Sequence, residues 1–156
     1  MDVVLEKPWR DLRAYVESRK AEAKAELKLA LILAREGYLR NAAGKLFQAF
    51  KSYVAALAGE RRHELKTRWR DVDKIIAYMP TRVLKEVASA LGLKKEGYVA
   101  LALHQFQYNG PDPEGVMSIY PDKKAALRDF CWLAKRIADL LNAAEEAAYL
   151  GELCKE

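Results

Sequence analysis

Residues 38–58 read Tyr-Leu-Arg-Asn-Ala-Ala-Gly-Lys-Leu-Phe-Gln-Ala-Phe-Lys-Ser-Tyr-Val-Ala-Ala-Leu-Ala. Apolar residues recur every three or four positions, which is the spacing of one helical face: Leu39, Ala43, Leu46, Phe47, Phe50, Tyr53, Val54 and Leu57. Polar residues repeat at the same spacing on a second face: Asn41, Lys45, Gln48 and Ser52. The pattern predicts a helix that packs into a bundle and presents amide and ammonium donors to a groove.

The composition is typical of a soluble, mainly helical protein. The chain has 156 residues, of which 51% are apolar and 31% charged, and its net charge is +5. This length suits a single domain over residues 1–156. Ala, Leu, Lys, Glu and Arg dominate, which favours helices, and the scarcity of Ser, Thr, Asn and Gln suggests a thermophilic source. The mild positive charge is compatible with nucleotide or nucleic-acid partners, and also with simple solubility.

Start and stop signals divide the rest of the chain into helices. A first helix is predicted from Pro8 to Glu36, with Gly37 as its stop. The basic stretch 60–74 leads into a third helix that Pro80 interrupts, and further helices follow over about 81–91 and 95–108. Residues 109–115 combine Asn, Gly and Pro and predict a loop. Without any strand alternation, we expect an all-α, up-down antiparallel four-helix bundle with one or two extra short helices.

The C-terminal part predicts one long helix, from Pro121 and Asp122 to about Leu150. Cys131 and Cys154 would lie about 34 Å apart on a straight helix, so we expect no disulfide between them and a reducing cytoplasm as the compartment. Residues 1–9 lack the basic and long apolar regions of a signal peptide. No apolar run reaches the length of a membrane span.

Two short motifs carry a family resemblance. Residues 40–50 have the form Arg-Asn-Ala-Ala-x-Lys-x-Phe-x-Ala-x, and residues 103–110 read Leu-His-Gln-Phe-Gln-Tyr-Asn-Gly. Both resemble recurring segments of the archaeal paREP family, within the HEPN superfamily of nucleotide-binding and nucleic-acid-processing helical bundles. The resemblance implies a HEPN-like four-helix core, frequent homodimerisation and a role linked to nucleotides or RNA.

The same resemblance raises the question of ribonuclease activity. Many HEPN members use an Arg followed, after four to six residues, by a His, so that the guanidinium holds a phosphate while the imidazole acts as general acid or base. The residues at that spacing are Gly97, Tyr98 and Val99 before His104, and Ala56, Leu57 and Ala58 before His63. Neither histidine has the required Arg, and we predict no catalytic residue.

Five polar residues form the candidate ligand site: Asn41, Lys45, Gln48, His104 and Tyr108. His104 and Tyr108 share a helix face at i and i+4, where they could meet a nucleobase or a phosphate. Gly44 permits a backbone or a ligand to approach closely. The alternatives are a solvated helix face, a glycine needed only for helix packing, and a histidine bonded to backbone at a helix end.

A second, weaker candidate is a basic patch for nucleic acid: Arg61, Arg62, Lys66, Arg68, Trp69 and Arg70. Its cations could follow a phosphate backbone while Trp69 stacks on a base, although the interleaved acids allow local ion pairs instead. Glu60-x-x-His63 is half of a di-metal signature whose other ligands are missing. We therefore expect neither a metal nor a cofactor.

These observations favour a non-catalytic nucleotide- or RNA-binding module. One alternative is a protein-interaction module of a toxin–antitoxin-like pair, whose partner would be a nucleotidyltransferase. Another is an unusual ribonuclease that lacks the Arg–His motif. In each case we expect a cytoplasmic homodimer that does not contact a membrane.

Overall fold

Helices are the only regular secondary structure in the described part of the chain. The computed structural model describes residues 4–155, which contain eight helices and no strand. The helices are α1 (Leu12–Arg35), α2 (Leu39–Glu60), α3 (Arg62–Leu65), α4 (Val72–Tyr78), α5 (Thr81–Ala90), α6 (Lys94–Asn109), α7 (Lys123–Leu140) and α8 (Ala144–Leu153). The prediction of an all-α protein is confirmed, but the described residues contain four short helices (α3, α4, α5 and α8) beside the four longer ones, not one or two. Within residues 4–155, no helix has the length and apolarity needed to cross a bilayer.

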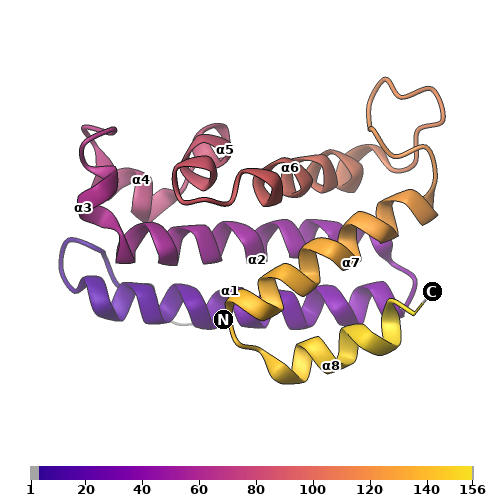
Figure 1. The fold of residues 1–156 in the computed structure, drawn as a ribbon, viewed down its shortest axis with the longest axis horizontal. Helices are drawn as coiled ribbons and strands as arrows, with labels where there is room; N and C mark the ends of the chain where they lie inside the picture. The colour runs from indigo at the N-terminus through magenta and orange to yellow at the C-terminus, as the bar shows by residue number, and fades with distance from the viewer. Residues whose placement is uncertain (1–3, 156) are drawn as a thin grey trace.

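α2 lies at the centre of the fold. It packs along α1, contacts α4, α5 and α6 on its other side, and is crossed by α7 (Figure 1). Residues on nearly all sides of α2 are buried, including Leu46, Phe50 and Val54 without any exposure. A helix that is apolar almost all round must be enclosed by its neighbours. The core face predicted for residues 38–58 is therefore present, and the buried surface extends well beyond it.

The start of α1 differs from the prediction. Asp11 is the N-cap, and its carboxylate accepts a hydrogen bond from the backbone N–H of Ala14 at 3.0 Å, whereas Pro8 lies in a turn before the helix. An aspartate cap satisfies a backbone donor that proline at the first turn leaves open. Gly37, at φ +91°, ends the helix as predicted.

The predicted single C-terminal helix is two helices, α7 and α8. Asn142 adopts φ +54°, and backbone bonds run from Asn142 N to Asp139 O (3.2 Å) and from Ala143 N to Ala138 O (2.9 Å). This is the Schellman ending of a helix, in which a residue with positive φ stops the helical path. The chain then reverses, and α8 lies against α1 and α7.

The reversal brings Cys154 back to Cys131, and the two form a disulfide with a Cα–Cα distance of 6.0 Å. The expectation that helical spacing keeps these cysteines apart was wrong, because it assumed one unbroken helix. The reason offered for a reducing cytoplasm, two cysteines without a bridge, no longer holds.

Candidate functional site

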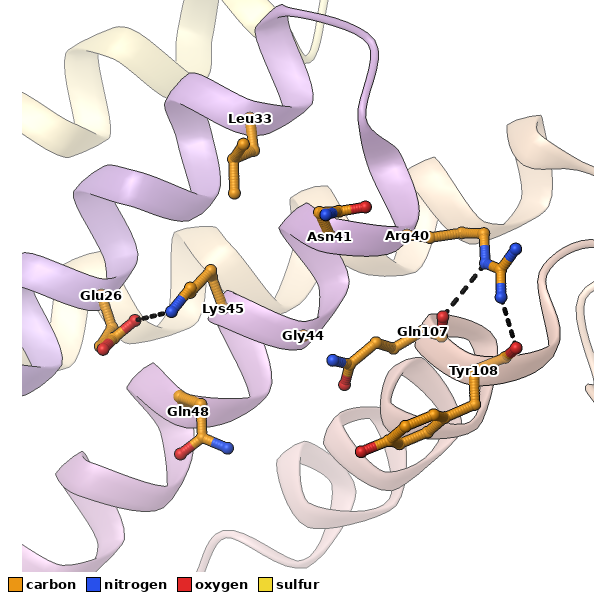
Figure 2. A pocket seen from close by; sticks show the side chains of 9 residues that line it. All are labelled: Glu26, Leu33, Arg40, Asn41, Gly44, Lys45, Gln48, Gln107 and Tyr108. Carbon is orange, nitrogen blue, oxygen red and sulfur yellow. Dashed lines mark hydrogen bonds and ion pairs between the residues drawn. The ribbon is translucent and has the colours of Figure 1, made fainter.

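A polar groove lies between α1, the first half of α2 and the end of α6. Its volume is about 690 Å³. Figure 2 shows the side chains that line it: Glu26, Leu33, Arg40, Asn41, Gly44, Lys45, Gln48, Gln107 and Tyr108. Four of the five predicted ligand residues are among them, from two helices far apart in the sequence. The fifth, His104, is not part of the lining.

The α2 wall carries Asn41, Lys45 and Gln48 at helical spacing. Lys45 Nζ lies 3.6 Å from Glu26 Oε2, and both side chains are partly exposed. Among residues 4–155, no donor lies within hydrogen-bonding distance of the buried Glu26 Oε2. The ion pair is longer than a hydrogen bond and partly exposed, so the Lys45 ammonium keeps donors free for an anion in the groove.

Ser52 does not share the groove with these residues. The pattern assigned it to the same polar face, but it is buried and its hydroxyl donates to Glu22 Oε1 at 2.6 Å. Glu22 also accepts from Arg19 Nη1 at 2.6 Å. Ser52 therefore belongs to a polar network between α1 and α2, because α2 is enclosed on more sides than an amphipathic pattern implies.

Gly44 and Gln107 set how closely α2 and α6 approach each other at the groove. A Cβ added to Gly44 would lie 2.5 Å from Cδ and Nε2 of Gln107, which is shorter than any contact between such atoms. The Gln107 amide can therefore lie where it does only because Gly44 has no side chain. This contact is tight packing between α2 and α6, the alternative that the sequence left open beside the close approach of a ligand.

Arg40 fixes the last turn of α6 against the first turn of α2. Its Nε donates to the carbonyl of Gln107 at 3.1 Å, and its Nη2 donates to the carbonyl of Tyr108 (Figure 2). The final carbonyls of a helix have no partner within the helix, and a cation there also suits the helix dipole. Arg40 thus positions Tyr108, a residue that is 64% exposed at the edge of the groove.

His104 lies behind Tyr108, between the two helices. Its ring stacks on Phe47 with centroids 4.1 Å apart and meets the Tyr108 ring edge-on at 5.3 Å. Among the described residues, no hydrogen-bond partner reaches its buried Nδ1. Burial lowers the pKa of His104, and the nearby Lys51 ammonium acts in the same direction, so the imidazole is neutral at pH 7. The His104 ring thus packs between Phe47 and Tyr108 and helps to hold the Tyr108 ring in place.

The predicted basic patch lies at the other end of α2, about 30 Å from Asn41 along the helix. Arg62 pairs with Asp73 through Nε and Oδ1 at 2.7 Å, and Arg61 reaches the carbonyl of Leu91 at 3.4 Å. Trp69 is half-buried, and the Arg68 guanidinium lies over its ring at 5.0 Å. Lys66 and Arg70 are exposed. Much of the patch is thus engaged in local contacts.

Metal-ligating residues do not gather within residues 4–155, where no group of three His, Cys, Asp or Glu side chains could hold an ion. Glu60 of the Glu-x-x-His pair instead meets Lys20 at 3.1 Å. The groove's chemistry is therefore that of amides, a phenol, two cations and a carboxylate.

Fold and site together define an all-α protein with a polar groove built on its central helix. The model of the archaeal PaREP1/PaREP8 family matches residues 18–131, and the chain belongs to this family. The matched segment contains every residue that lines the groove. A search of curated proteins and a search of solved structures each found no match.

Proposed function

We propose that this protein binds a nucleotide, free or as part of an RNA, in the groove between α1, α2 and α6, and that it does so without catalysis. The observation that carries the proposal is the convergence of donors in one hollow from two helices. The volume of about 690 Å³ falls in the range of small-molecule sites. Two cations, Arg40 and Lys45, face one carboxylate, Glu26, so the lining carries a net charge of +1.

Each side chain has a role suited to one part of a nucleotide. Lys45 meets the phosphate through its free donors. The amides of Asn41, Gln48 and Gln107 each offer both a donor and an acceptor, which suits the edge of a base. Tyr108 stacks on the base with its exposed ring or donates through its hydroxyl.

Lys45→Ala tests the proposal, with Lys135→Ala in α7 as a matched control, because Lys135 Nζ lies 3.6 Å from Asp139 Oδ1, the same distance as in the Lys45–Glu26 pair. The probes are adenosine monophosphate and a short oligouridylate, with affinity measured by calorimetry. Loss of one charge-assisted contact should raise Kd about tenfold or more for Lys45→Ala. The melting temperature should fall by no more than a few degrees, because the pair with Glu26 is partly exposed. If neither probe binds the unmodified protein, the proposal fails.

We also propose a HEPN-like bundle that forms a homodimer. The four longest helices alternate in direction along the chain (Figure 1). Trp9 and Tyr78 are 52% and 65% exposed and line one hollow beside α1, and exposed aromatic side chains are enriched at interfaces. Sedimentation that finds a monomer at micromolar concentration would reject the dimer. A crystal structure in which these four helices do not pack as an up-down antiparallel bundle would reject the HEPN-like arrangement.

A rigid apolar loop favours the interaction-module alternative as a second candidate. Between α6 and α7, Val116, Met117 and Ile119 are 76%, 60% and 65% exposed. The Asp112 carboxylate accepts backbone N–H bonds from four residues of this loop, which fixes its shape: Glu114, Val116, Met117 and Ser118. An ordered loop that exposes aliphatic side chains suits a protein partner such as a nucleotidyltransferase.

Substituting Val116, Met117 and Ile119 together by Ser tests this second candidate. If a neighbouring gene encodes a nucleotidyltransferase, the variant should lose co-purification with that enzyme, while nucleotide binding in the groove persists. Unchanged co-purification would reject the loop as the interface.

A further inference from the structure

A second pocket lies between α1 and α8, away from the groove. Its volume is about 170 Å³, and its lining comes from α1 and α8 alone: Lys28, Leu31, Ile32, Glu145, Glu146 and Tyr149. In Figure 1, α8 runs beside α1 on the side away from α2. The disulfide at Cys154 anchors this wall to α7. The pocket is therefore a lasting feature of the oxidised protein.

Glu146 is the unusual residue of this pocket. Its side chain lines the hollow, yet the residue is only 5% exposed. Among residues 4–155, no donor lies within hydrogen-bonding distance of its buried Oε2. A buried carboxylate oxygen without a partner is costly. Glu146 lies in the first turn of α8, where the helix dipole offsets part of that cost. Its Oε2 can still accept a hydrogen bond from a ligand.

The surroundings of Glu146 are apolar, with charge only at the edge. Leu31 is 2% exposed and Ile32 42% exposed, and the Tyr149 ring completes the wall. The exposed Lys28 and Glu145 stand at the edge. Two carboxylates and one ammonium give the lining a net charge of −1, in a chain whose net charge is +5.

We propose that this pocket binds a primary ammonium group carried on a short alkyl chain. The ammonium donates to Glu146 Oε2, and the methylene groups lie against Leu31 and Ile32. Such a ligand is either a free alkylamine or diamine, or a lysine side chain of another protein. This site is independent of the groove and goes beyond the nucleotide-binding proposal.

Other occupants fit the pocket less well. A buried water needs two to four polar partners, and the wall around Glu146 is mainly aliphatic and aromatic. Calcium takes six to eight oxygen ligands, and only two carboxylates are present. A guanidinium binds a carboxylate best through two oxygens side by side, whereas here a single buried oxygen lacks a donor. An ammonium donates from one point and its alkyl chain is apolar.

Thermal unfolding of the intact, oxidised protein tests the proposal. The probes are n-butylammonium chloride, 1,4-diaminobutane and Nα-acetyl-lysine methylamide, which distinguish a free amine from a lysine side chain. Sodium chloride at equal ionic strength and n-butanol separate the effects of salt and of the alkyl chain. At ten times Kd, an amine that binds should raise the melting temperature by about 3 to 6 °C more than its controls. No rise with any of the three amines overturns the proposal.

Three variants locate the effect. Glu146→Gln should abolish the response to the amines, whereas Glu145→Gln, one residue away and exposed, should retain most of it. Ile32→Lys places an ammonium in the pocket from a position that is 42% exposed, and it should raise the melting temperature while removing the amine response. If Glu146→Gln responds as the unmodified protein does, or if it cannot fold and Ile32→Lys keeps the full response, the proposal is overturned.

Discussion

Replacing Gly44 by Ala should stabilise the protein slightly while disturbing the groove. Alanine is better than glycine inside a helix by about 0.8 to 1.0 kcal/mol. The new Cβ would lie 2.5 Å from the end of the Gln107 side chain. The atoms in question are the far end of a flexible side chain, so Gln107 moves into the groove at little cost. We expect a gain of about 0.5 to 1 kcal/mol in unfolding free energy and a loss of nucleotide affinity.

Gly59→Ala is the matched control, because it makes the same change in the same helix. Its Cβ would lie 2.8 Å from Val16 Cγ2, part of a stiff, buried β-branched side chain that cannot swing aside. Overpacking of this kind costs about 1 to 3 kcal/mol. Guanidinium unfolding of both variants should therefore place Gly59→Ala about 1 to 3 kcal/mol below Gly44→Ala. Equal destabilisation of the two variants would refute the assignment of Gly44 to the groove contact.

Three further predictions concern stability. Replacing Cys131 and Cys154 by Ser should lower the unfolding free energy by about 3 kcal/mol through the freed chain entropy, and a melting temperature equal to that of the oxidised protein would contradict this. Arg136→Met should lower the free energy of unfolding, measured with urea, by about 3 kcal/mol. The reason is that Arg136 Nη2 donates to Oε2 of the buried Glu96 at 2.9 Å. An unchanged free energy of unfolding would show that Glu96 finds another partner. Burial lowers the pKa of His104 below its ordinary value of about 6.5, so the stability it contributes is complete above that pH and falls as the pH drops below it. His104→Asn should reduce the dependence of the unfolding free energy on pH between pH 7 and pH 5. An unchanged dependence on pH would exclude His104 as its cause.

Much of the helix pattern was predictable because it depends on local chemistry. Gly37 and Pro80 mark boundaries through their own backbone preferences, and both boundaries fall where expected. Asn142 carried the signal that was missed, since asparagine is the residue other than glycine that most often ends a helix with positive φ. The helical spacing of apolar residues continues on both sides of Asn142, so the sequence was interpreted as one unbroken helix. The disulfide could not be predicted while that turn was unknown.

The groove was predictable from α2 but not from its neighbours. Asn41, Lys45 and Gln48 share a face within one helix, so their spacing alone groups them. Glu26 and Gln107 join them only through the packing of α1 and α6 on α2, which no local pattern contains. Arg40 stands within the family motif, yet its bonds to the end of α6 depend on the same long-range packing.

The most direct test of the central claim is a titration with adenosine monophosphate followed through the side-chain amide signals in a ¹⁵N-resolved NMR spectrum. The chain has only three asparagines and three glutamines, so these signals are few. If the groove binds the nucleotide, the amides of Asn41, Gln48 and Gln107 shift together with one Kd, while that of Asn142, in the exposed turn before α8, stays in place. If the three amides remain unmoved at millimolar nucleotide, the groove is not a nucleotide site.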